Sequence, residues 1–345
     1  MQGSQEATLV AAAVFNDTSP TRHHGCNAVM QALDAGLREQ GIEPGFYWPV
    51  GVDWRPFADA LMRERVDIVV VNGEGTIHHS AERERARALC AIPAFAHERL
   101  GAPAVLVNAS VEALEPAALE GLRGFDAIHV RETVSRTYLE SRGIEATFAP
   151  DLSFATPLPT EDRVRSGLLV TDSVSAEIAE ALRSVADTVG GSFESMRHRA
   201  SLLERLGRSF MKRARSGPPL RRALECTSDY RAFVERLAAK ETVVTGRFHT
   251  VTLALLTATP VIAVPSNTAK IRAVLSDALG DAGRQVDMHD SSDLPGRLRA
   301  RLDEGIGYDE GEREALSRYL EHARDAHARM FRSIARIAGV SGTAS

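Results

Sequence analysis

The sequence contains few cysteines, few aromatic residues and no excess of positive charge. Its three cysteines, Cys26, Cys90 and Cys226, are far apart and form no CxxC pair, which argues against a disulfide framework and against a structural zinc site. Aromatic residues make up only 6% of the chain, so helices packed on short buried strands are favoured over an all-β sandwich. The formal net charge of -5 gives no support to a nucleic-acid partner.

Long hydrophobic runs are also missing. No run approaches the roughly 18 consecutive apolar residues that span a bilayer. The first ten residues, MQGSQEATLV, lack the basic and apolar regions of a secretory signal. Together with the isolated cysteines, these absences predict a cytoplasmic protein, at most in contact with the inner face of the membrane.

What the sequence does contain is a regular alternation of short apolar runs and amphipathic stretches. With 345 residues, 44% of them hydrophobic, the chain can form two domains that each bury a core. The predicted strands are residues 8–15, 46–50, 66–71, 104–108, 127–130, 167–171, 242–245, 261–264 and 285–288. The predicted helices are residues 27–39, 55–63, 81–99, 133–142, 175–189, 229–239, 251–256, 268–279, 293–303 and, as one helix or two packed across both halves, 310–337. Apolar strands that alternate with helices are typical of parallel sheets covered on both faces, so we predict an α/β protein.

A proline-containing stretch at residues 149–159 separates two halves of similar architecture. We predict a first Rossmann-like domain over residues 1–155 and a second over residues 160–308. A C-terminal helical segment over residues 309–345 completes the predicted organisation.

Residues 197–222 interrupt this pattern, with nine Lys or Arg residues against a single acidic residue, Glu204. Apolar residues interleave with the basic ones at roughly helical spacing. Two interpretations stay open. One is a solvated pair of surface helices, and the other is a basic amphipathic flap that contacts an anionic membrane or a lipid-linked, phosphate-bearing acceptor.

Two candidate site loops follow predicted strands of the first half, where ligands bind in sheets of this type. Residues 16–27, NDTSPTRHHGCN, form a long polar loop in which Gly25 lets the backbone approach a ligand closely. Residues 72–80, NGEGTIHHS, place Glu74 between two glycines at the end of a strand. A carboxylate there could act as a general base or accept a hydrogen bond from a sugar hydroxyl. A plain polar connector is the alternative interpretation of both loops.

The second half offers the sharpest candidate, TGRFHT at residues 245–250. Arg247 and His249 lie there between a predicted strand and a predicted helix start, and in a locally extended turn they would project to one side. Helix-start N–H groups and arginine bind anions, and histidine can move a proton near neutral pH. A further loop, PSNTAKIR at residues 265–272, adds Lys270 near the same crevice.

Several of these segments occur together in one known family. The run TGRFHTVTLALLTATPVIAVPSNTAKIRAVL resembles the C-terminal motif of polysaccharide pyruvyl transferases, in which an Arg-x-His turn precedes a small-residue helix, a Pro-led strand and a Lys-Ile-Arg helix. VVVNGEGTIHHS is similar to the family's glycine-rich loop, with Glu74 in place of its middle glycine. VRETVSRTYLESRGI followed by APDLSF is similar to its VR-x-x-x-S segment and the acidic turn after it. The resemblance covers most of residues 7–280 and implies a GT-B-like fold of two facing Rossmann-like domains.

The resemblance implies a transferase that moves a pyruvyl group from phosphoenolpyruvate to a pair of sugar hydroxyls, as a ketal on a cell-surface polysaccharide precursor. It implies a sugar or lipid-linked glycan as acceptor and no cofactor besides phosphoenolpyruvate as co-substrate, and the fixed cations make a metal ion unnecessary. The sequence is also compatible with an oligomer. The predicted catalytic residues are His249 and Glu74. The predicted donor-binding residues are Arg247, Thr250, Lys270, Arg131 and Ser135. The predicted acceptor-binding residues are His23, His24, Gly25, Asn72, Gly73, Gly75, His78, His79 and Asp151.

Two other functions stay open at this point. On the same scaffold, a glycosyltransferase would use the cationic cluster to hold the phosphates of a nucleotide-activated sugar and Glu74 as its base. A non-catalytic binding subunit is disfavoured, because it would have no need of Glu74, Arg247 and His249 at strand ends.

Overall fold

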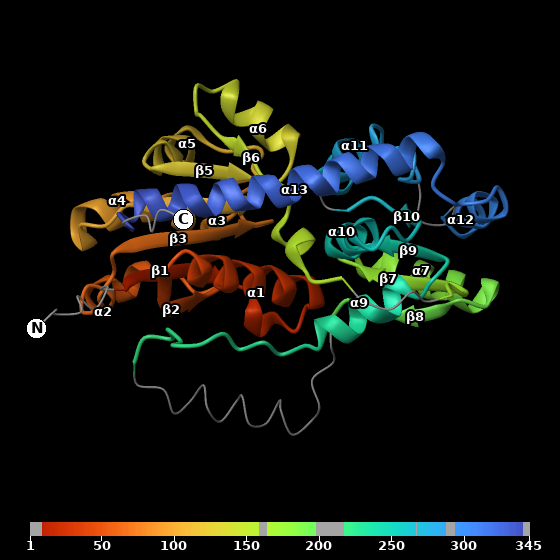
Figure 1. Ribbon diagram of the computed structural model, residues 1–345, viewed down its shortest axis with the longest axis horizontal. Helices are drawn as coiled ribbons and strands as arrows, with labels where there is room; N and C mark the ends of the chain where they lie inside the picture. The colour runs from red at the N-terminus through yellow and green to blue at the C-terminus, as the bar shows by residue number, and fades with distance from the viewer. Residues whose placement is uncertain (1–8, 159–163, 198–216, 267, 288–293, 341–345) are drawn as a thin grey trace, which may run out of the picture.

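The protein consists of two parallel β-sheets, each covered by helices (Figure 1). The computed structural model describes residues 9–158, 164–197, 217–266, 268–287 and 294–340. The larger sheet has the strand order β2-β1-β3-β4-β5-β6 and the smaller sheet the order β10-β9-β7-β8. Neighbouring strands are parallel throughout both sheets. The predicted α/β class with two Rossmann-like sheets is therefore confirmed.

Strands and helices alternate along most of the described chain. The strands are β1 Val10–Asp17, β2 Ile42–Pro49, β3 Ile68–Glu74, β4 Ala104–Ala109, β5 Ala127–Val130, β6 Thr147–Phe148, β7 Leu168–Ser173, β8 Ser192–Glu194, β9 Thr242–Gly246 and β10 Val261–Ala263. The α-helices are α1 His24–Glu39, α2 Ala58–Leu61, α3 Glu84–Cys90, α4 Ile92–Phe95, α5 Pro116–Arg123, α6 Thr133–Glu140, α7 Ala176–Val189, α9 Tyr230–Ala238, α10 Phe248–Leu256, α11 Lys270–Leu279, α12 Leu294–Asp303 and α13 Glu310–Ile337.

Burial explains the two elements that carry most of the site. Strand β3 has the sequence IVVVNGE, and all of its residues are buried, as expected for a β-branched run at the centre of a parallel sheet. Helix α10 also buries every residue, because it packs against β9 and β10 on one side and against α1 of the first half on the other. The start of α10 is therefore fixed against both halves of the molecule.

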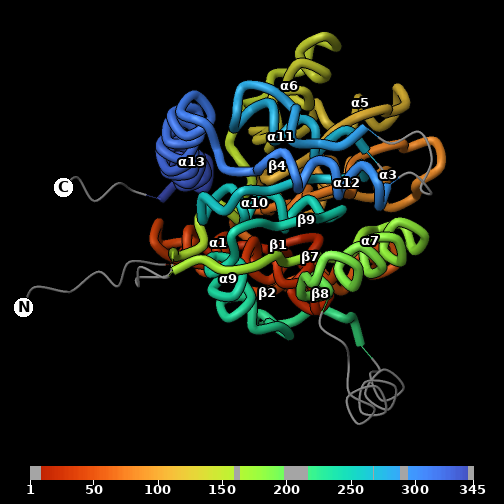
Figure 2. The backbone as a smooth tube through the Cα atoms, turned by 90° about the vertical axis from the view of Figure 1, so that its right-hand side faces the viewer, coloured from red at the N-terminus to blue at the C-terminus, as the bar shows by residue number. Residues whose placement is uncertain are grey.

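Helix α13 connects the two halves. Asp309 and Glu312 form a capping box at its N-terminus, which satisfies backbone N–H groups of the first turn. Tyr319 belongs to a core cluster of the second half, and Phe331 belongs to one of the first half. Figure 1 shows α13 along the long axis of the molecule, and Figure 2 shows it nearly end-on at one flank. The prediction of a helix packed across both halves is confirmed, as a single helix.

Several predicted elements are wrong in detail. The helix predicted over residues 81–99 is broken into α3, α4 and a π-turn at Ala96–Leu100, because Pro93 cannot donate the hydrogen bond that would continue α3. The helix predicted over residues 55–63 is a 3-10 turn followed by the single turn of α2. In place of the strand predicted at residues 285–288, the described part has only a bridge between Gln285 and Ala263. Strands β6 and β8 were not predicted, because two and three residues are too few for a clear periodicity. Helix α5 was not predicted either.

The predicted basic segment at residues 197–222 lies mostly outside the described residues. Its first residue, Arg197, forms a β-bridge with His23, and Arg221 forms one with Tyr47. Both visible ends of the segment are thus attached to the first half. Among the described helices, none has the length and apolar character needed to cross a membrane.

Candidate active site

A cleft of about 300 Å³ lies where the strand orders of both sheets change direction. The loops that follow the neighbouring strands β1 and β3 of the first sheet border this cleft. The loops that follow β7 and β9 of the second sheet border it from the other half. Such switch points place loop residues and helix N-termini beside a ligand in doubly wound sheets. The predicted site residues that line this cleft are His23, Glu74, Gly75, Arg131, Arg247, His249 and Lys270.

A smaller cavity of about 80 Å³ adjoins the cleft and shares Gly75 and Lys270 with it. His78 and Ser135 lie in its wall. The hydroxyl of Ser135 accepts from Val111 N at 2.9 Å, so it is already used by the protein. The remaining predicted residues, His24, Gly25, Asn72, Gly73, His79, Asp151 and Thr250, line neither cavity.

Glu74 is a buried carboxylate held from three sides. Its Oε1 accepts from Thr18 Oγ1 at 2.5 Å and from Asn72 Nδ2 at 3.1 Å, and its Oε2 accepts from Cys26 Sγ at 3.3 Å. The backbone of Glu74 has a φ of 39°, which a residue with a side chain rarely adopts. Gly73 allows this turn, because a Cβ there would lie 2.4 Å from Ala109 Cβ of strand β4. Tight packing at the strand end therefore directs the carboxylate into the cleft.

Arg131 is a buried cation that is shared between two carboxylates. Its Nε donates to Glu132 at 3.1 Å and its Nη1 to Asp151 at 2.8 Å. The guanidinium also lies over the Phe248 ring, 4.1 Å from the centroid. Burial alone would lower the pKa of Arg131, but Asp151 and Glu132 outweigh it and raise this pKa. Arg131 therefore stays charged at the wall of the cleft, where its Nη2 lies beside Gly75.

His249 lies in the first turn of α10, directly in front of Asp151. Its buried Nε2 has no hydrogen-bond partner among the described residues and lies 3.7 Å from Asp151 Oδ2, too far for a hydrogen bond. Burial would raise the pKa of Asp151, but His249 and Arg131 outweigh it and hold this pKa well below its usual value. Asp151 thus sits behind His249 as an ionised carboxylate.

Gly25 packs against the His249 side chain. A Cβ on Gly25 would lie 2.1 Å from His249 Cβ, so only glycine allows α1 to come this close. Gly25 was predicted to let the backbone come close to a ligand. In this structure, the group that comes close to Gly25 is the side chain of His249.

Arg247 is held by a carboxylate that the sequence analysis missed. At the end of β7, Asp172 accepts from Arg247 Nε at 2.9 Å and from its Nη2 at 3.0 Å, a bidentate pair. Ser195 Oγ also donates to Asp172, at 2.7 Å. Burial would raise the pKa of Asp172, but the pairing with Arg247 lowers it. The only signal in the sequence was an acidic residue at the end of a predicted strand.

Arg247 and His249 line the same cleft, but their backbone conformation differs from the predicted one. Helix α10 begins at Phe248, so Arg247 is its extended N-cap residue and His249 is helical. The predicted extended turn is therefore wrong, although both residues line the cleft.

Lys270 begins α11 and completes the cationic wall. Burial, followed by the neighbouring Arg131, lowers the pKa of Lys270 to about 8. Unlike the two arginines, it can thus lose its charge under mildly alkaline conditions.

Other predicted residues contact protein groups around the site. The ring of His24 stacks on Phe233 at 4.7 Å, away from the cleft. Thr250 is fully buried beside Thr171. His79 lies 3.6 Å from Glu112, next to the smaller cavity.

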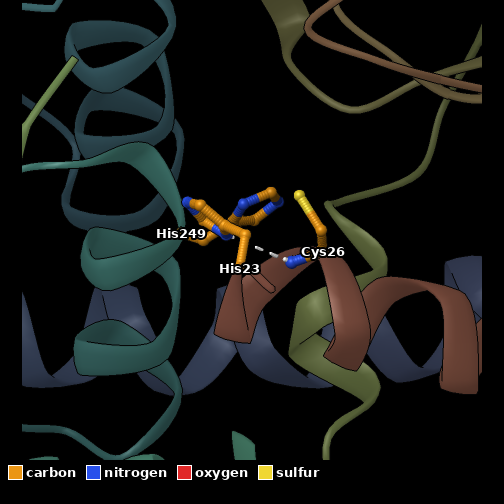
Figure 3. A group of neighbouring side chains, drawn as sticks. All are labelled: His23, Cys26 and His249. Atoms are coloured by element: carbon orange, nitrogen blue, oxygen red, sulfur yellow. Dashed lines mark hydrogen bonds between the residues drawn. The ribbon is translucent and has the colours of Figure 1, made fainter. Parts of the chain in front are cut away.

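Three side chains at the cleft have the residue types of a metal site. His23 and Cys26 project from the start of α1 and His249 projects from α10, toward one another (Figure 3). Their candidate ligand atoms all lie within 4.8 Å of one another. A second group with this spacing consists of His78, His79 and Glu112.

The model of the polysaccharide pyruvyl transferase family matches residues 23–268, more than half of the chain. A search of the curated protein sequences finds no match.

Solved structures with a similar fold include several enzymes of nucleotide sugars. The UDP-N-acetylglucosamine 2-epimerase of Rickettsia bellii aligns with a TM-score of 0.55 and 13% identity, over 95% of this chain and 96% of that one. A putative UDP-N-acetylglucosamine 2-epimerase of Listeria monocytogenes gives 0.55 and 13%, over 96% and 98%. The α,α-trehalose-phosphate synthase (UDP-forming) of Burkholderia vietnamiensis gives 0.51 and 12%, over 98% and 100%. At these identities, the likeness establishes the GT-B-like fold and nothing further.

Proposed function

This chain belongs to the polysaccharide pyruvyl transferase family, and from that premise we propose that it transfers a pyruvyl group from phosphoenolpyruvate to two hydroxyls of a sugar. The product is a cyclic ketal on a precursor of a cell-surface polysaccharide. The donor carries a carboxylate and a phosphate close together on a three-carbon enol, so its site must offer several cations in a small space.

One observation carries this proposal: Arg131, Arg247 and Lys270 surround the same cleft that His249 and Glu74 border. Arg247 is oriented by Asp172 and would bind the carboxylate or phosphate of the donor through its remaining edge. Arg131 and Lys270 would stabilise the negative charge that builds up on the departing phosphate.

The proton transfers fall to His249 and Glu74. His249 donates a proton to the methylene carbon of the enol, which makes the central carbon electrophilic, and Glu74 accepts the proton of the attacking hydroxyl. Phosphate then leaves, and the second hydroxyl adds to the same carbon to close the ketal. Two hydroxyl protons are lost in total. One is balanced by the proton on the new methyl group, and the other by the proton that inorganic phosphate carries away.

The acceptor would enter over the first half. Glu74 would orient it from β3, with His78 of the adjoining cavity as a second polar contact. Arg197 lines the cleft at the start of the basic segment, so this segment begins where a lipid-linked, phosphate-bearing acceptor would lie. We extend the proposal to a cytoplasmic enzyme that reaches such an acceptor at the inner face of the membrane.

The experiment that tests the donor is a thermal-shift series with phosphoenolpyruvate, UDP and UDP-sugars. A ligand at 100 times its Kd adds about 2.7 kcal/mol to the free energy of unfolding, which raises Tm measurably. We expect phosphoenolpyruvate to stabilise the protein and Arg247→Ala to abolish this effect. Turnover is then followed as phosphate release that depends on both donor and acceptor, and His249→Ala should remove it.

A second candidate function is glycosyl transfer from a nucleotide-activated sugar. The observation in its favour is the fold similarity to proteins whose names include UDP-N-acetylglucosamine or UDP formation. Stabilisation by UDP or a UDP-sugar, with no effect of phosphoenolpyruvate, would replace the first proposal with this one.

A further inference from the structure

The side chains of His23, Cys26 and His249 form a donor set that no step of the proposed reaction uses as a unit. His23 is the N-cap residue of α1 and Cys26 follows three positions later, a spacing that places both on one face of the helix start. His249 comes from the facing start of α10, and its ring centroid lies 5.3 Å from that of His23. Two helices from different halves thus bring one thiol and two imidazoles together.

We propose that His23, Cys26 and His249 bind one Zn²⁺ or chemically similar ion when no substrate is bound, a state in which His249 is a ligand and does not serve as the proton donor of the proposed reaction. Zinc sites in proteins use three or four ligands of these types in tetrahedral arrangement, with bonds of about 2.0–2.3 Å. Such bonds separate the ligand atoms by about 3.5 Å. The present separations of up to 4.8 Å would therefore have to shorten by roughly 1 Å on binding.

The surroundings of two of the ligands suit this role. Among the described residues, the Nδ1 of His23 accepts one long hydrogen bond of 3.3 Å, from Cys26 N, which coordination through this atom would replace. Within the part of the chain that the structure describes, the buried Nε2 of His249 has no hydrogen-bond partner, and it faces Asp151. A carboxylate behind a ligating histidine is the usual outer contact in zinc sites.

A carboxylate that can accept the proton of the Cys26 thiol lies beside it. The Cys26 thiol donates to Glu74 Oε2 at 3.3 Å. Binding replaces this proton by the metal, as coordination requires. Formally, the S–H bond breaks, an S–metal bond forms and the proton passes to Glu74 or to water.

The choice of ion follows from the ligand types. A thiolate and two imidazoles select zinc, cobalt and similar ions over magnesium and calcium, which prefer oxygen ligands. The group of His78, His79 and Glu112 lacks a thiol, and His79 is largely exposed. We therefore place the ion at the first group and use the second as a control.

The test is a Co²⁺ titration of the full-length protein, followed by absorption, with Zn²⁺ binding measured by equilibrium dialysis. The expected result is one ion per chain, a thiolate-to-cobalt charge-transfer band and the strong visible bands of tetrahedral Co²⁺. Cys26→Ser should lose the charge-transfer band. It should also weaken Zn²⁺ binding by more than the roughly 10–100-fold loss that is typical for an outer contact of a metal site. His23→Gln provides an independent second variant, and circular dichroism shows whether each variant is folded.

Matched controls use the same residue types outside the group. Cys226→Ser removes an exposed thiol and His79→Ala removes a histidine of the second group, and both should bind Co²⁺ as the unchanged protein does. Equal binding by folded Cys26→Ser and Cys226→Ser, or cobalt spectra without a thiolate band, would overturn the proposal. Because binding is measured without substrates, the result is independent of whether the proposed reaction is correct.

Discussion

Replacing Asp172 by asparagine tests whether a pre-oriented Arg247 binds the donor. The side chains of Asp172 and Arg247 are only 14% and 13% exposed. Breaking a fully buried charge pair costs about 3–5 kcal/mol, and breaking an exposed pair costs about 0–1 kcal/mol. This pair lies between these limits, so we expect the free energy of unfolding to fall by roughly 2 kcal/mol.

The same variant should lose affinity for the donor. A binding group that is misplaced by about 1 Å can cost up to roughly 100-fold in rate, and Arg247 would lose the bidentate partner that fixes its guanidinium. We therefore expect kcat/KM for phosphoenolpyruvate to fall about 10–100-fold, mainly through KM, because the carboxylate and phosphate are already charged in the ground state. Steady-state kinetics with varied phosphoenolpyruvate and urea unfolding measure the two effects.

Glu194→Gln is the matched control for Asp172→Asn. Glu194 ends the neighbouring strand β8 and pairs with Arg236, but that arginine side chain is 50% exposed and the pair lies away from the cleft. Its loss should change the free energy of unfolding by less than about 1 kcal/mol and leave KM unchanged. If Asp172→Asn behaved like Glu194→Gln in both assays, Arg247 would not depend on this carboxylate and our account of donor binding would be wrong.

Three further predictions concern other parts of the site. Glu74→Gln keeps the shape of the side chain but removes a base, so turnover should fall by roughly 100–10,000-fold while the thermal shift with phosphoenolpyruvate persists; unchanged turnover would remove Glu74 from the mechanism. The pKa of Lys270 is about 8, so Lys270 loses its charge above this pH, and the Kd for phosphoenolpyruvate should rise by up to about tenfold per pH unit. Lys270→Arg should flatten this profile between pH 7 and 9.5. An identical slope in the variant would assign the pH dependence to another group. Gly25→Ala should displace His249 and cost about 1–3 kcal/mol of stability together with most activity; a variant with unchanged Tm and turnover would contradict the packing argument.

The parts of the site that lie within one sequence segment could be predicted. The buried run that ends in Asn72-Gly73-Glu74-Gly75 identified the central strand and the carboxylate after it, because strand and turn are both encoded locally. Arg247 and His249 were found in the same way, since they stand between an apolar strand and an apolar helix.

Contacts between distant segments could not be predicted. Asp172 and Arg247 are 75 positions apart, and nothing in either segment indicates their pairing. Gly25 was predicted to let the backbone approach a ligand. In the structure, a glycine is required at this position because the His249 side chain, 224 residues later, leaves no room for a Cβ. His24 looked like a site residue beside His23, yet a helix turns adjacent side chains by about 100°, and this rotation directs it onto Phe233.

Asp151 shows how the two halves form one chemical unit. Its Oδ2 accepts from Arg131 Nη1 at 2.8 Å, within the first half, and lies 3.7 Å from His249 Nε2 of the second half. Shortening the second distance by less than 1 Å would create a hydrogen bond, and such catalytic bonds are often long before substrates bind. The orientation of the His249 ring therefore depends on how closely α10 approaches the first half. Under the proposed reaction, a ligand that bridges Arg131 and Arg247 would draw these same elements together, and donor binding would then be coupled to the proton transfer by His249 through one buried carboxylate.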